Sequence, residues 1–209
     1  MCYTSQTTSR NGKKSTPDFY LQGCVALNGL LLKLLDDQYG EPGIWFVKLF
    51  TPIILKLDCY YWCFDQQPWA SPPDSFADHP NLLQAFAGDQ ESGMMLWKTR
   101  TLGRYARYFM SENIELWAID SAKCDPAELA RQYVSSDESG KEQIIAGHAA
   151  TLLIYTDATS WEIYSNQPNI LQTVRGHAQC MPSSVKVFDS HYDRRPSAFE
   201  QAGLSDVLG

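Results

Sequence analysis

Apolar residues follow two different spacings along this chain, and the change of spacing divides it into a front half and a back half. Up to about residue 110 they recur three or four positions apart, which predicts helices. Beyond residue 112 they alternate with polar residues or form short β-branched and aromatic runs, which predicts strands. Helices followed by mainly antiparallel strands predict an α+β fold, with the N-terminal helices packed on the sheet.

Three helices are expected in the front half. The first covers residues 18–38, with Asp18 as its N-cap. The second covers the apolar run 44–64, where Pro52 predicts a kink or a break into two helices. The third covers residues 94–110, because its apolar side chains fall at helical spacing.

Four runs in the back half are expected to form the sheet, because they are rich in β-branched and aromatic residues. A short turn at 157–160 separates two of them and predicts a hairpin. Helices are expected between the strands, over 126–134 and 168–175, and a proline opens each of these segments. The predicted strands are Ile114–Ile119, Ile144–Thr156, Trp161–Ser165 and Val185–Phe188.

The composition fits one folded domain preceded by a flexible lead. The chain has 209 residues, of which 44% are hydrophobic and 20% charged, so it can bury a sizeable core. Residues 1–17 are rich in Ser, Thr, Gly and Lys and have few apolar anchors. We therefore expect a flexible lead over 1–17 and a single α+β domain over 18–209.

Charge and cysteine content narrow the partners and the compartment. The formal net charge of −7 argues against nucleic acid or an anionic membrane as the partner and leaves a protein partner or protein substrate. Residues 1–17 are polar and the six cysteines form no compact framework, so we expect no signal peptide and a location in the cytoplasm or another reducing cytosol. Charged residues interrupt the apolar run 44–64, so no membrane span is expected.

A cysteine, a histidine and an asparagine stand in an order that can carry hydrolytic chemistry. Cys24 follows Gln22-Gly23 at the start of the predicted first helix, where the helix dipole would lower the pKa of the thiol. His148 opens a predicted strand and could take the thiol proton, while Asn166 ends the next strand and could orient the imidazole.

These elements resemble papain-like cysteine peptidases, and most of all their bacterial effector branch. The segment from Gly23 to Leu27 resembles the start of the family's nucleophile helix, and Gly147-His148-Ala149 resembles the start of its central strand. The resemblance implies a papain-like fold and a hydrolase, either a peptidase or an amidase or deamidase, that is delivered into a reducing cytosol. It implies Cys24, His148 and Asn166 as the triad and needs no cofactor.

Several alternatives stay open beside this triad. Cys24 could be a small buried hydrophobic residue, and Asp189 could replace Asn166 as the orienting group. The cysteines and histidines lack the paired short spacings of a zinc site, so no metal is expected. Neither a phosphate loop nor a dinucleotide fingerprint is present. A basic stretch, best interpreted as a solvated helix face, contains Lys98, Arg100, Arg104 and Arg107.

The alternative function is a non-catalytic inhibitor, such as an immunity protein that binds and blocks a partner toxin or enzyme. A compact, acidic, aromatic-rich domain suits this role, because acidic surfaces steer basic partners toward them. The candidate anchors are Trp69, Asp74 and Asp78, which lie in a proline-rich loop that could present them outward.

Overall fold

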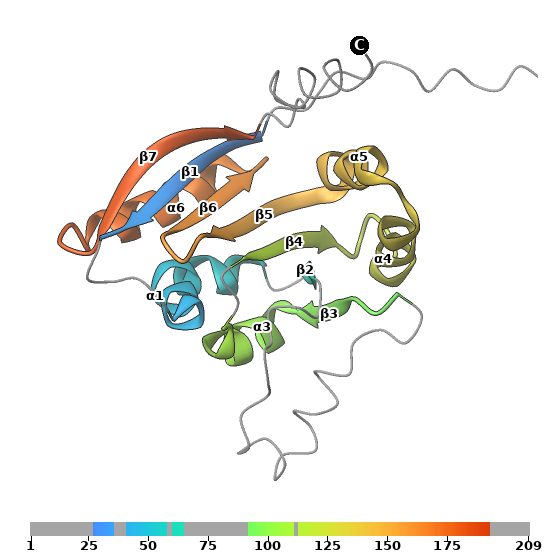
Figure 1. Cartoon of the computed structure of the whole chain (residues 1–209), viewed down its shortest axis with the longest axis horizontal. Helices are drawn as coiled ribbons and strands as arrows, with labels where there is room; N and C mark the ends of the chain where they lie inside the picture. The colour runs from blue at the N-terminus through green and yellow to red at the C-terminus, as the bar shows by residue number, and fades with distance from the viewer. Residues whose placement is uncertain (1–26, 36–40, 58–59, 65–91, 111–112, 193–209) are drawn as a thin grey trace, which may run out of the picture.

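The computed structural model of the chain describes residues 27–35, 41–57, 60–64, 92–110 and 113–192. Within these ranges the chain is an α+β fold, with one seven-stranded sheet whose neighbouring strands are all antiparallel. The strand order is β3-β2-β4-β5-β6-β1-β7 (Figure 1). The strands are β1 Leu27–Leu34, β2 Tyr60–Phe64, β3 Met95–Lys98, β4 Ile114–Asp120, β5 Ala149–Thr156, β6 Ser160–Ser165 and β7 Val185–Tyr192.

Helices lie against both faces of this sheet. The larger core packs between one face and a helical layer made of α1, α3 and α6, with the short 3-10 turns η2 and η4 beside them. The smaller core packs between the other face and α4 with α5. The helices are α1 Pro42–Ile54, η2 Leu55–Leu57, α3 Thr99–Tyr105, η4 Ala106–Tyr108, α4 Pro126–Ser135, α5 Glu138–His148 and α6 Pro168–Gln179.

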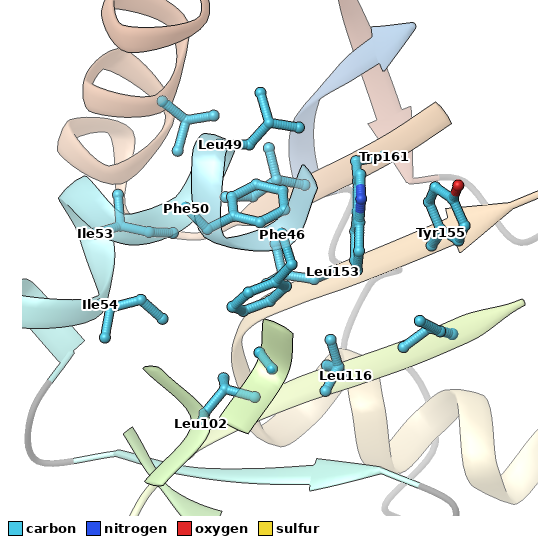
Figure 2. Close-up of a cluster of buried hydrophobic side chains, with 14 of the residues drawn as sticks. Phe46, Leu49, Phe50, Ile53, Ile54, Leu102, Leu116, Leu153, Tyr155 and Trp161 are labelled. Carbon is cyan, nitrogen blue, oxygen red and sulfur yellow. The ribbon is translucent and has the colours of Figure 1, made fainter. Parts of the chain in front are cut away.

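Trp161 of β6 is fully buried in the larger core, between the rings of α1 and Tyr155 (Figure 2). Its ring centroid lies 5.5 Å from that of Phe46 and 5.3 Å from that of Phe50, both edge-on and both from α1. On the sheet side Tyr155 of β5 lies 4.9 Å away. Edge-to-face contacts of this kind add to the apolar area that the rings bury, so they fix α1 on the sheet.

The expected first helix over 18–38 is wrong for the residues that the structure describes, because β1 occupies 27–34. Leu30, Leu32 and Leu34 point into the larger core, whereas Leu31 between them is half-buried and Lys33 is exposed. This two-residue alternation over 30–34 is that of a strand, and β1 pairs along its length with β6 and β7. Long-range pairing therefore outweighs the helical propensity of leucine.

Pro52 does lie inside α1, as expected, but the second predicted helix is wrong at its far end, where 60–64 form β2. A proline at 52 cannot donate to the carbonyl of Lys48, one turn earlier. That carbonyl instead accepts a hydrogen bond from Nε2–H of His177 on α6, at 2.7 Å. The missing helical bond thus becomes a link between α1 and α6.

Two other boundaries differ from the prediction. Residues 95–98 form β3, so only the later part of the expected helix 94–110 is helical. Residues 144–148 end α5, so the predicted strand Ile144–Thr156 begins only at Ala149. Asp137 caps α5 by accepting a hydrogen bond from the backbone N–H of Gly140.

The rest of the predicted back half is confirmed. β4, β6 and β7 contain the predicted strands, and β5 and β6 form the expected hairpin. Asp157 and Ala158 in its turn both have positive φ, as a tight primed turn requires. Asp125 caps α4 by accepting from the N–H of Ala127 at 3.0 Å. The expected flexible lead over 1–17 lies outside the described residues.

None of the helices in the described ranges is long and apolar enough to cross a membrane.

Candidate functional site

The predicted triad is only partly within the described residues. Cys24 lies outside them, and the chain that follows it enters a strand at Leu27 rather than a helix. The helix-dipole argument for an acidic Cys24 thiol therefore loses its basis. His148 is the last residue of α5 and not the start of a strand, and its side chain is exposed. Asn166 follows β6, as predicted, and is also exposed.

The structure nevertheless brings Leu27, Asn166 and the start of β5 to one end of the sheet. The backbone N–H of Asn166 donates to the carbonyl of Ala150, two residues beyond His148, at 3.4 Å. Continuing the β1–β6 register by two residues places Leu27 opposite Asn166. Cys24 lies three residues before Leu27, a reach of about 10 Å in a fully extended chain. Among the described residues, no hydrogen bond joins the side chains of His148 and Asn166.

The other candidate groups do not complete this triad. Asp189 forms an ion pair with Arg175 of α6, so the alternative orienting group is engaged elsewhere. Cys63 is fully buried in the smaller core. Burial raises the pKa of the Cys124 thiol, and the carboxylates of Asp120 and Asp125 add to the effect, so Cys124 is not an activated nucleophile. Trp69, Asp74 and Asp78 lie outside the described residues.

No three potential metal ligands gather within the ranges that the structure describes.

The feature that stands out instead is a row of partly exposed side chains on the sheet face against which α4 and α5 pack. Directly opposed residues of an antiparallel pair point to the same face. Successive pairing from β4 to β7 connects five such positions, and none of the five is buried. Phe188, at the end of the row, is 46% exposed. We call this set the open row: Glu115, Ile154, Glu162, Leu31 and Phe188.

The helices α4 and α5 stop short of the open row. Trp117 lies two positions beyond Glu115 on β4, and Leu152 lies opposite it on β5. Both are buried in the smaller core beneath these helices. Trp117 contacts Tyr133 of α4, with ring centroids 5.2 Å apart. The two helices thus cover the row of Trp117 and Leu152 but not the neighbouring open row on the same face. β4 and β5 are therefore buried at one end and partly accessible at the other.

Tyr164 forms the border of the open row. Its ring lies over Gly29, where an added Cβ would stand 2.3 Å from the tyrosine Cδ1, so only glycine fits. Its hydroxyl donates to the Glu162 carboxylate and lies 3.0 Å from the hydroxyl oxygen of Ser190. Burial raises the pKa of Tyr164 to about 12, and the hydrogen bond to Glu162 acts in the same direction. One acid of the row is therefore held in place.

Charge is segregated between the two sides of the molecule. The helical layer of α1, α3 and α6, with η2 and η4, contains no Asp or Glu. Both α4 and α5 carry carboxylates. The basic stretch predicted as a helix face is helical only in part. Arg100 and Arg104 lie on α3 and Arg107 on η4, whereas Lys98 ends β3 on the same face as Leu96, which packs against the smaller core. The cations of the helical layer are Lys48, Lys56, Arg100, Arg104, Arg107 and Arg175.

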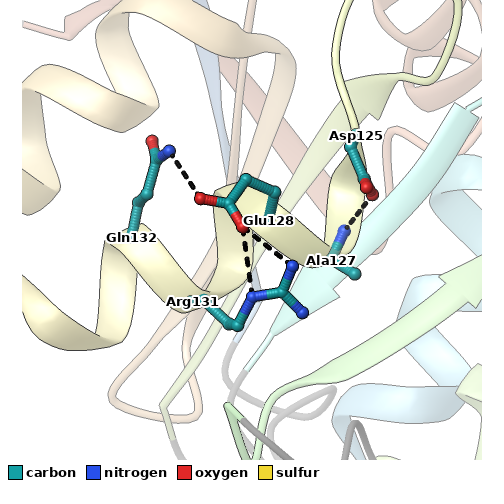
Figure 3. A network of polar contacts seen from close by, with 5 residues as sticks. All are labelled: Asp125, Ala127, Glu128, Arg131 and Gln132. Atoms are coloured by element: carbon teal, nitrogen blue, oxygen red, sulfur yellow. Dashed lines mark hydrogen bonds and ion pairs between the residues drawn. The ribbon is translucent and has the colours of Figure 1, made fainter.

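A depression of about 410 Å³ beside α4 is a weaker candidate. Ser92 and residues of α4 line it. Glu128 accepts hydrogen bonds from Arg131 at 2.8 Å and from Gln132 at 3.0 Å (Figure 3). The side-chain bond from Arg131 lowers the pKa of Glu128. These i,i+3 and i,i+4 contacts are those of an ordinary stabilised helix, and they satisfy the charge of Glu128 within α4.

Sequence reasoning missed the open row, because its members come from strands far apart in the chain. Only the pairing register aligns them, and no local pattern contains that register.

Comparison of the chain with protein-family models, with curated proteins and with solved structures finds no match.

Proposed function

We propose that this protein is a non-catalytic binding domain of the inhibitor type, which places the open row against a basic and partly apolar surface of a partner protein. The observation that carries the proposal is the open row itself. Five adjacent strands each contribute one accessible side chain, at a spacing of about 4.8 Å per strand. The row therefore spans about 19 Å, a length suited to a protein interface.

The chemistry of the row supports a protein partner. An antiparallel sheet with one solvated face normally presents polar side chains to water. Here Ile154, Leu31 and Phe188 are accessible, with Glu115 and Glu162 between or beside them. Apolar groups bordered by charges are typical of docking surfaces. Because the side chains project from a paired sheet, their backbone is ordered before binding and the entropy cost is small.

The charge distribution supports a basic partner. The chain carries a net charge of −7, whereas the helical layer has only cations. Among the described residues, the eleven Asp and Glu all lie outside this layer, which holds six of the twelve Lys and Arg. Such an asymmetry orients an approaching basic protein toward the acidic side and raises its association rate.

The test begins with the capture of partners on immobilised full-length protein. A captured protein is then purified and titrated against the wild type, against Ile154→Ser and against Phe188→Ser. We expect each row variant to weaken the dissociation constant about tenfold or more, since apolar anchors dominate interface energies. Arg107→Gln, on the helical layer, is the control and should bind like the wild type. A partner whose affinity depends on Arg107 and not on the row would overturn the proposal.

A second candidate is the cysteine hydrolase implied by the resemblance, with Cys24 as nucleophile, His148 as base and Asn166 as orienting group. It is supported by the convergence of Leu27, Asn166 and the start of β5 at one end of the sheet. The thiolate would attack a carbonyl carbon, and the imidazolium would protonate the leaving amine.

A thiol-directed probe at mildly acidic pH, followed by peptide mapping, tests this candidate. Selective labelling of Cys24 over the exposed Cys180, with loss of a hydrolytic activity on Cys24→Ala and on His148→Ala, would favour the enzyme over the inhibitor. Labelling of Cys180 alone, with partner binding unchanged in both variants, would remove the hydrolase hypothesis.

A further inference from the structure

We infer that β7 is a self-association edge, at which two copies of this chain pair their β7 strands antiparallel and join their sheets into one. β7 ends the strand order, and β1 is its sheet neighbour within the described residues. It is eight residues long and pairs with β1 in an unbroken register, from Leu27 opposite Tyr192 to Leu34 opposite Val185. This inference does not depend on the proposed inhibitor function.

Within the described residues, β7 has few of the devices that protect a sheet edge. Proteins blunt exposed edges with short strands, prolines, bulges, charged side chains or a covering helix or loop. β7 contains no proline, its register shows no bulge, and its charged side chains are Lys186 and Asp189. Near its middle stands Phe188, which is 46% exposed. A long, regular edge with an accessible aromatic side chain is a template for another strand.

The hydrogen-bond alternation identifies which backbone groups a second strand would meet. Leu34 N–H donates to Thr159 on the β6 side, and Leu35 N–H donates to Ser184 on the β7 side. With this alternation, even-numbered β7 residues such as Phe188 bond to β1. Val187, Asp189 and His191 then direct their N–H and C=O groups away from the sheet. In the described part of the chain, these outward groups have no strand beside them.

The side chains favour one register about a two-fold axis. Across the new pair, an odd-numbered residue of one β7 must lie opposite an odd-numbered residue of the other, because only these residues direct their backbone groups outward. One β7 residue therefore lies opposite its own copy, and the two-fold axis passes between these two residues. An axis at Asp189 would place this carboxylate opposite its own copy, which is unfavourable. An axis at Phe188 places the two phenyl rings opposite each other, in the pair type whose side chains approach closest. In that register Val187 meets Asp189, and Lys186 meets Ser190, so no like charges are opposed.

Pairing of this kind places the two open rows on the same side of the joined sheet, because opposed residues of antiparallel strands share a face. Phe188 ends the row in each copy, so the two rows become one continuous surface through the paired rings. The charges within β7, Lys186 and Asp189, cancel, but each chain carries −7 overall. Long-range repulsion therefore opposes the dimer at low ionic strength, and salt should strengthen it.

The experiment measures the mass of the full-length protein by sedimentation equilibrium over a concentration series, at low and at moderate salt. We expect a monomer–dimer equilibrium that shifts toward dimer as salt rises. Phe188→Lys should raise the dimer dissociation constant at least about tenfold, because it opposes two cations at the axis. The matched control is Val134→Lys, which replaces another exposed apolar residue, 48% exposed, on α4. It should leave the equilibrium unchanged.

A cross-link tests the register. With Phe188→Cys, the two thiols at the axis should form an interchain disulfide, because Cα atoms of such a pair lie about 4.5 Å apart. Peptide mapping separates this bond from bonds of the native cysteines, and circular dichroism checks the fold of each variant. A wild type that stays monomeric at every concentration and salt would overturn the proposal. A dimer that resists Phe188→Lys and forms no 188–188 bond would overturn it as well.

Discussion

The two faces of the sheet differ in how much of each is covered. On one face α1, α3 and α6 bury side chains from the strands, and Leu32, Leu34 and Trp161 are fully inaccessible. On the other face α4 and α5 bury Trp117 and Leu152 but leave the open row accessible. The same strands therefore provide the core on one side and a surface on the other. The difference separates residues that form the core from residues that are only partly covered.

The largest effect is expected on the covered face, from Trp161→Ala. The substitution removes a ring that Phe46, Phe50 and Tyr155 surround, and the cavity should cost about 3–5 kcal/mol of unfolding free energy. Urea denaturation followed by circular dichroism measures the loss. A cost near zero would mean that this face is not the principal core.

A smaller effect is expected from Gly29→Ala, on the face of α4 and α5, where Tyr164 borders the open row. The new methyl group would stand 2.3 Å from Cδ1 of the Tyr164 ring and 2.6 Å from the carbonyl oxygen of Ile163, so we expect a loss of about 1–3 kcal/mol in unfolding free energy. Tyr164→Ala removes the ring but leaves the carbonyl oxygen, and it is the matched background. In that background Gly29→Ala should cost less but should still destabilise the protein, and equal costs in both backgrounds would contradict the packing of Tyr164 over Gly29.

The raised pKa of Tyr164 predicts a change at alkaline pH. In the unfolded chain the phenol loses its proton near its ordinary pKa of 10, whereas in the folded protein it does so near about 12. The tyrosine therefore contributes stability that is fully present below pH 10 and is lost as pH rises toward 12. The wild type should lose more unfolding free energy over this interval than Tyr164→Phe. Parallel losses in both proteins would show that Tyr164 titrates normally.

The smallest effect on stability is expected in the open row, from Phe188→Ser. Phe188 is 46% exposed, so little apolar area is lost, and we expect a change of about 0.5 kcal/mol or less. The same urea measurement applies. A loss as large as that of Trp161→Ala would make Phe188 a core residue and would end the distinction between the two faces.

Local features of the fold could be predicted from the sequence. Asp125 and Pro126 begin α4 as their residue types require, and the turn after Thr156 joins β5 to β6. These features depend on contacts within a few residues. The α+β class followed in the same way, because the back half supplies strand patterns of its own.

Long-range features could not be predicted. The leucine-rich run in β1 suits a helix as well as a buried strand, and only its place between β6 and β7 decides for the strand. His148 was expected to open a strand, but it is the last residue of α5, which Asp137 caps at its start. The open row depends on the register of five strands, which one sequence does not contain.

The central claim is that the open row binds a partner and the helical layer does not. The most direct measurement is isothermal titration of a purified captured partner against three forms of the chain: the wild type, Ile154→Ser and Arg107→Gln. The account predicts that affinity falls about tenfold or more with Ile154→Ser and stays at the wild-type value with Arg107→Gln. Unchanged affinity with Ile154→Ser, together with a loss on Arg107→Gln, would contradict it.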